Sequence, residues 1–240
     1  MQQDPIPWSK VEAILFDLDG TLVETDNRWA AILAEKLRPL KRLLPRLDVE
    51  RLARAIVMGI ETPGNYAISV LEHLGLSTSF FGLADWVRRS KGLATREAAE
   101  LVAGSEALLA ALDGRLKLGV VTTRAKPEAE AFIRLAGLER FFAAVVTRQD
   151  VWRMKPHPEP IHKAAALLGV APERCVVVGD TVMDIRAARR AGAYAVGVLS
   201  GFGERRELER AGAHLILESA VQLLEHLPRA QGPAESHPEI

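Results

Sequence analysis

Two aspartates one residue apart, Asp17 and Asp19, directly follow the apolar run 13–16. An apolar run of this length without polar interruption is typical of a strand buried on both faces of a sheet. Gly20 can bend the chain so that the two carboxylates converge, but without a counter-ion they would repel each other. A magnesium ion (Mg²⁺) relieves this repulsion and keeps coordination positions for water and phosphate oxygens. The pattern therefore predicts a magnesium site that handles a phosphate ester.

Two later segments carry polar groups suited to phosphate. Thr122 and Thr123 follow the apolar run 116–121, where a threonine hydroxyl and the N–H groups of a coming helix can hold a phosphate oxygen. Lys155 lies in the proline-rich stretch 154–160, which holds an ammonium group at low entropic cost. Taken singly, such a threonine is commonly a helix N-cap and such a lysine a solvated surface residue, so both alternatives stay open here.

A second acidic pair, Asp180 and Asp184, follows the apolar run 175–178. Residues four apart at the start of a helix lie on one face, and carboxylates there are favoured by the positive end of the helix dipole. Asp180 alone could instead cap the helix. Because four strand ends each carry a group suited to phosphoryl chemistry, one shared site explains them better than separate structural roles do.

Predicted strands and helices alternate along the part of the chain that carries these groups. This rhythm predicts an α/β fold, a Rossmann-like open parallel sheet with helices on both faces, in which ligands bind beyond the carboxyl ends of the strands. Residues 1–10 read as an extended lead-in. Strands are expected at 11–17, 116–121, 143–147, 175–178 and 193–198 with an edge strand at 215–217, and helices at 105–112, 127–137, 158–168, 183–191 and 219–227.

Residues 23–96 show helical periodicity and no strand signal. We expect them to form a separate helical block inserted into a catalytic core made of residues 1–22 and 97–228. The tail 229–240 is rich in Pro, Gly, Gln and Glu and is expected to be disordered.

Composition narrows the possible partners. The chain has 240 residues, 48% of them hydrophobic, which is enough for a substantial core. Lys plus Arg and Asp plus Glu both total 31, so the net charge of +0 predicts neither nucleic-acid nor membrane binding. The single cysteine, Cys175, excludes an intrachain disulfide and is expected in the core. No segment has the length and hydropathy of a membrane span, so we expect a cytoplasmic protein, as a monomer or homodimer.

The stretch Phe-Asp-Leu-Asp-Gly-Thr-Leu-Val at residues 16–23 resembles motif I of the haloacid dehalogenase-like hydrolase superfamily, whose members are mostly magnesium-dependent phosphatases. The segments at Thr122, Lys155 and 179–185 resemble its motifs II to IV. The resemblance implies that Asp17 is the nucleophile that forms an aspartyl-phosphate and also a metal ligand. It further implies that Asp19 is the general acid/base and offers its backbone carbonyl to the metal.

The same resemblance assigns the remaining roles. Thr122 would bind phosphate, Lys155 would neutralise the nucleophile and the phosphoryl group, and Asp180 would ligate the metal directly. Asp184 would support the metal through water or through Lys155. The inserted block resembles a type C1 cap of phosphoglycolate-phosphatase-like members, in which Arg54 and the stretch 61–66 are the first candidates for substrate contact.

These observations predict a phosphatase that hydrolyses a small phosphorylated metabolite. A phosphosugar mutase of the β-phosphoglucomutase type, or an inorganic pyrophosphatase on the same core, would keep the same residues. A non-catalytic phosphate-binding regulatory protein is the alternative from another class, because fold alone does not establish function. Dehalogenases of the superfamily generally lack the second motif I aspartate, so Asp19 argues against that activity.

Overall fold

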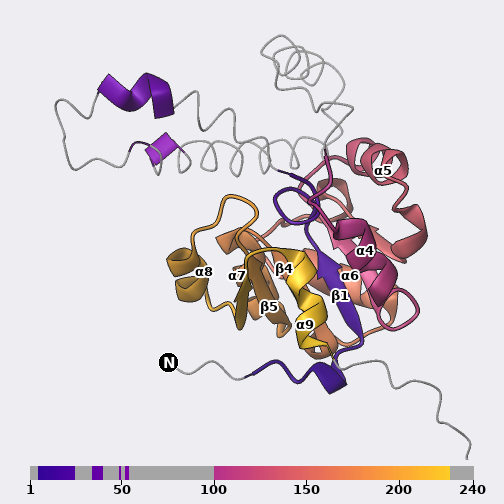
Figure 1. The fold of residues 1–240 in the computed structure, drawn as a ribbon. Helices are drawn as coiled ribbons and strands as arrows, with labels where there is room; N and C mark the ends of the chain where they lie inside the picture. The colour runs from indigo at the N-terminus through magenta and orange to yellow at the C-terminus, as the bar shows by residue number, and fades with distance from the viewer. Residues whose placement is uncertain (1–4, 25–33, 40–48, 50–51, 54–99, 228–240) are drawn as a thin grey trace, which may run out of the picture.

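The computed structural model describes residues 5–24, 34–39, 49, 52–53 and 100–227. Its centre is a parallel sheet in the order β3-β2-β1-β4-β5-β6. Figure 1 labels three neighbouring strands of this sheet, β1, β4 and β5. The order reverses between β1 and β4, which makes the sheet doubly wound. The strands are β1 (Ala13–Phe16), β2 (Lys117–Val121), β3 (Ala144–Val146), β4 (Cys175–Gly179), β5 (Tyr194–Val198) and β6 (Leu215–Leu217).

The strands form where apolar runs can be buried on both faces. All four residues of β1 are fully buried, as an unbroken apolar run predicts. In the register of the sheet Phe16 pairs with Val120 on one side and with Val178 on the other. The residues that follow β1, β2 and β4 therefore lie close together at the carboxyl ends of these parallel strands.

Two apolar cores lie on opposite faces of this sheet. On one face α4 (Ser105–Leu112), α5 (Lys126–Leu135) and α9 (Leu223–His226) contribute to the core. On the other face α6 (Glu159–Leu168), α7 (Val182–Ala191) and α8 (Arg205–Ala211) do so. Helices on both faces are the arrangement that right-handed crossovers between parallel strands produce. Short 3-10 helices occur at Trp8–Lys10, Glu139–Phe141, Arg148–Asp150, Pro172–Arg174 and Ala220–Gln222.

The predicted fold class is confirmed, with local differences. The expected lead-in contains the 3-10 turn Trp8–Lys10, and the last expected helix divides into Ala220–Gln222 and α9. Helix α8 was not expected, because its sequence RRELERA has few apolar residues and buries only Leu208. Ser105 is the first residue of α4, and its hydroxyl donates to the carbonyl of Leu22.

Most of the predicted helical block 23–96 and the tail 229–240 lie outside the described residues, as do the candidate substrate contacts Arg54 and 61–66. Their predicted structure and roles remain predictions. Among the helices that the structure does describe, none combines the length and the apolar character needed to cross a bilayer.

Candidate active site

The predicted site residues meet beyond the carboxyl ends of the central strands. Asp17 follows β1, Thr122 follows β2 and Asp180 follows β4. Strands β1 and β4 are the neighbours between which the strand order reverses, and this is where an open parallel sheet offers a crevice. Gly20 has a φ of 75°, so the chain turns sharply after Asp19, as the sequence suggested.

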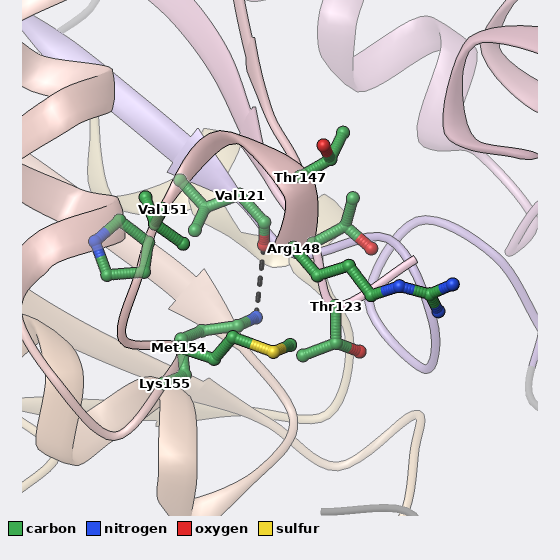
Figure 2. Close-up of a pocket in the computed structure, with 9 residues that line it drawn as sticks. Val121, Thr123, Thr147, Arg148, Val151, Met154 and Lys155 are labelled. Carbon is green, nitrogen blue, oxygen red and sulfur yellow. Dashed lines mark hydrogen bonds between the residues drawn. The ribbon is translucent and has the colours of Figure 1, made fainter. Parts of the chain in front are cut away.

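Lys155 connects three of these strand ends. Its ammonium donates to Oδ1 of Asp17 at 2.7 Å, to Oδ1 of Asp184 at 2.5 Å and to the carbonyl oxygen of Val121 at 3.0 Å. Figure 2 shows the bond to Val121. These acceptors match the three donors of an ammonium group. Lys155 is buried, so the alternative of a solvated surface lysine is wrong.

Asp184 is held by the helix that carries it. It is the third residue of α7, and its Oδ2 accepts from the backbone N–H and the hydroxyl of Thr181, the N-cap residue. The Thr181 hydroxyl in turn accepts from the N–H of Asp184, which completes a capping box. Oδ2 of Asp184 therefore caps the start of the helix, and Oδ1 binds Lys155. The cap of this helix is Thr181, so the alternative of Asp180 as a cap is wrong.

Asp180 is oriented by the loop after β5. Its Oδ2 accepts from the backbone N–H of Phe202 at 2.7 Å, whereas its buried Oδ1 has no hydrogen-bond partner in the part of the chain that the structure describes. The loop lies so close that a Cβ on Gly201 would be 1.9 Å from Oδ2. The same loop ties down the first acidic segment, because the hydroxyl of Ser200 donates to the carbonyl of Gly20 at 2.7 Å.

The acidic groups fit a hard cation. Asp17, Asp180 and Asp184 are all buried, and each offers an oxygen within 4.8 Å of the others. Burial, together with the neighbouring carboxylates, raises the pKa of Asp17 to about 7 against the pull of Lys155. Burial also raises the pKa of Asp180, and the charges of Asp184 and Asp17 add to this rise. An unpartnered buried carboxylate oxygen is costly unless a cation takes it up, so this donor set suits Mg²⁺.

Asp19 is bound by a residue that sequence reasoning missed. Arg124 donates from Nη2 to Oδ1 of Asp19 at 2.5 Å and from Nε to Oδ2 at 2.8 Å. Burial lowers the pKa of Arg124, but the hydrogen bonds and charge of Asp19 outweigh it and raise the pKa overall. The guanidinium also lies over the ring of Phe132, 5.1 Å from its centroid. Its place directly after Thr122 and Thr123 was the signal that could have identified it.

The predicted phosphate-binding threonines lie beside these groups. Thr122 is buried, and its hydroxyl accepts from the N–H of Arg124 at 3.2 Å. The N-cap of α5 is Ala125, so the N-cap alternative for Thr122 is wrong. Thr123 lines a small pocket next to Lys155 (Figure 2). Both threonines are therefore close to the lysine, as the predicted site requires.

His157 lies in the loop that carries Lys155, two residues further along the chain. Its Nδ1 accepts from the N–H of Glu159 at 3.1 Å, at the first residue of α6. This bond satisfies one of the free donors at the start of that helix. The contact supports a structural role.

Carboxylates and a lysine beyond the switch point of a parallel sheet place this protein among the α/β enzymes that act on phosphate groups. The chain belongs to the haloacid dehalogenase-like hydrolase family, whose profile matches residues 14–198. The family resemblance is thereby confirmed, and together with the phosphatase relatives it supports the class of phosphoric monoester hydrolase.

Individual relatives agree with this assignment. Pyrophosphatase PpaX of Anoxybacillus flavithermus is 30% identical over 89% of this chain and 95% of its own length. A phosphoglycolate phosphatase of Shigella dysenteriae is 28% identical over 89% of this chain and 91% of its own length. The structure of a HAD family hydrolase from Deinococcus radiodurans, with bound phosphate and sodium, aligns with a TM-score of 0.62. It is 27% identical and covers 90% of this chain and 94% of the other.

Proposed function

We propose that this protein is a magnesium-dependent phosphatase that hydrolyses a small phosphorylated metabolite through an aspartyl-phosphate on Asp17. The observation that carries the proposal is the convergence of Lys155 with the carboxylates of Asp17 and Asp184, beside the unpartnered oxygen of Asp180. Phosphoryl transfer depends chiefly on positioning and on neutralising charge on the phosphoryl oxygens. This cluster has the groups for both tasks.

Asp17 is the nucleophile in this proposal. The ammonium of Lys155 binds Oδ1 of Asp17. This bond orients the carboxylate so that Oδ2 of Asp17 is the oxygen that attacks the substrate. The attacking oxygen forms a bond to phosphorus while the bond from phosphorus to the leaving oxygen breaks. All three protons of Lys155 are engaged by protein acceptors, so it acts on the phosphoryl group through its charge.

The other residues assist this displacement. Asp19 gives a proton to the leaving oxygen and later takes one from the water that attacks the aspartyl-phosphate. Thr122, with N–H groups in the turn before α5, holds the phosphoryl oxygens. Asp17, Asp180, Asp184 and the backbone carbonyl of Asp19 are the groups that would hold the cation, directly or through water. When bound, Mg²⁺ supplies positive charge to the phosphoryl oxygens and to the nucleophile.

The relatives favour two substrate classes. A phosphomonoester is the first candidate, because a phosphoglycolate phosphatase aligns over 91% of its length. Inorganic pyrophosphate is the second, because a pyrophosphatase aligns over 95% of its length. Both are small anions with more than one negative charge, so a screen must include both.

The test is a screen of small phosphate esters and pyrophosphate, with Mg²⁺ or with EDTA, for release of phosphate. The wild type should release phosphate from at least one compound only with the metal, and Asp17→Asn should lose at least about 1,000-fold in kcat. Asp113→Asn, a change at an exposed residue at the end of α4, is the matched control and should retain activity.

Three outcomes would contradict the proposal. Release of phosphate by Asp17→Asn at the wild-type rate would exclude Asp17 as nucleophile. An isomeric phosphosugar in place of free phosphate would establish a mutase. Binding of phosphate esters without turnover of any of them would establish the non-catalytic alternative.

A further inference from the structure

The second inference concerns Arg124, for which the phosphatase mechanism above has no role. Its guanidinium binds both oxygens of Asp19 through Nε and Nη2. The Arg124 side chain is 10% exposed, whereas that of Asp19 is 43% exposed. A two-point bond of this kind between guanidinium and carboxylate fixes orientation as well as distance. Arg124 is thus a buried cation held directly against the proposed general acid/base.

One edge of the Arg124 guanidinium is unused. Its Nη1 is buried and has no hydrogen-bond partner among the described residues. A buried donor on a charged group that lacks an acceptor costs free energy, which an incoming anion would recover. The ring of Phe132 supports the planar group from the side, so the fork is held in place.

The position of Asp19 indicates which part of a substrate would carry this anion. As the general acid, Asp19 must come within hydrogen-bond distance of the oxygen that leaves phosphorus. A guanidinium that binds Asp19 then lies next to the leaving group. A carboxylate or phosphate one or two bonds beyond the leaving oxygen can reach it. A leaving group without charge offers Arg124 no comparable partner.

We propose that Arg124 is a specificity-determining residue that selects substrates whose leaving group carries an anion, because that anion takes hydrogen bonds from Nη1 of the guanidinium whose Nε and Nη2 bind Asp19. This inference rests on the proposed function and narrows its substrate class. Phosphorylated short hydroxy acids and pyrophosphate belong to the selected class, and phosphate esters of neutral alcohols and sugars do not. No new covalent step is involved.

The test uses two phosphate esters with the same two-carbon skeleton, 2-phosphoglycolate, which ends in a carboxylate, and 2-hydroxyethyl phosphate, which ends in a neutral hydroxymethyl group. The wild type should have a kcat/KM at least about 30-fold higher for the carboxylate ester, the gain expected from charge-assisted hydrogen bonds. Arg124→Met should abolish this preference, because it lowers kcat/KM for 2-phosphoglycolate more than for the neutral ester. The loss should appear mainly as a higher KM for 2-phosphoglycolate. Arg124→Lys should retain part of the preference, because it keeps the charge and loses the fork.

Lys126→Met is the matched control, because it removes an exposed positive charge two residues along the chain. It should leave the substrate preference unchanged. Thermal melts of each variant separate loss of folding from loss of selection. Pyrophosphate serves as a second anionic substrate, with the same expectation.

Different results would overturn this inference and the proposed function. If the wild type hydrolyses both esters and Arg124→Met loses equally on both, Arg124 does not select the leaving group although the phosphatase assignment stands. A wild-type preference for the neutral ester would also overturn the inference. If none of the esters and pyrophosphate in the screen is hydrolysed with Mg²⁺, the proposed function itself fails.

Discussion

Oδ1 of Asp184 lies 2.5 Å from Nζ of Lys155, and the two side chains are only 2% and 5% exposed. The same ammonium binds Asp17, which is 138 residues away in sequence. Breaking a buried ion pair by removing one partner leaves an uncompensated buried charge, which is strongly destabilising. Lys155 is therefore expected to support the fold of the site as well as its chemistry.

Lys155→Met tests this double role. In EDTA the free energy of unfolding should fall by about 3 kcal/mol, because Asp17 and Asp184 lose their shared cation. Addition of Mg²⁺ should recover part of this loss, while kcat stays at least about 100-fold below the wild-type value. Urea denaturation with and without metal measures the first effect. Lys163→Met removes an exposed lysine and is the control; equal stability of Lys155→Met and wild type in EDTA would refute the argument.

The pH dependence of stability should reveal Asp17. Its pKa is raised in the folded protein from 3.8 to about 7, chiefly by burial. The folded state therefore binds this proton more tightly than the unfolded state does. That contribution to the free energy of unfolding is complete below about pH 4 and is lost as the pH rises to about 7.

Asp17→Asn carries a neutral side chain of the same shape at every pH. Without metal at pH 8 the variant should melt about 5 °C above the wild type, and the difference should vanish near pH 4. Thermal melts in EDTA across this pH range measure it. A difference in Tm between the two proteins that stays the same at every pH would show that Asp17 does not titrate as proposed.

The unpartnered oxygen of Asp180 predicts a measurable stabilisation by cations. Because the cation binds only the folded protein, Mg²⁺ should raise Tm by an amount that grows with the logarithm of its concentration. Asp180→Asn should weaken the apparent affinity at least about 10-fold, since it replaces a charged ligand by a neutral one. The exposed Asp113→Asn should keep the wild-type response. A full response in Asp180→Asn would remove this residue from the metal site.

Gly201 should be required for the orientation of Asp180. A methyl group there would lie 1.9 Å from Oδ2 of Asp180, so Gly201→Ala must displace either the loop or the carboxylate. We expect at least about a 10-fold loss in Mg²⁺ affinity, measured by calorimetry. Gly114→Ala is the comparison, because Gly114 has a φ of 73° but open space around its Cα. That variant should lose about 1 kcal/mol of stability and keep its metal affinity.

The strands of the sheet and most of the site residues could be predicted from local sequence patterns. Apolar runs of strand length, each followed by a polar residue, are local features, and they placed Asp17, Thr122 and Asp180 at the carboxyl ends of strands. Helix α8 (Arg205–Ala211) was not predicted, because one buried leucine in a charged segment is too weak a local pattern.

Which of these groups contact one another depends on the folded structure. The bonds of Arg124 to Asp19, of Lys155 to Asp184 and of Phe202 to Asp180 join residues that are 105, 29 and 22 positions apart. No local pattern encodes such contacts, because each depends on the strand order and on how tightly the connecting loops pack against one another. The residue types could thus be predicted from the chain, whereas the partner of each charge follows from the packing of the sheet and its loops.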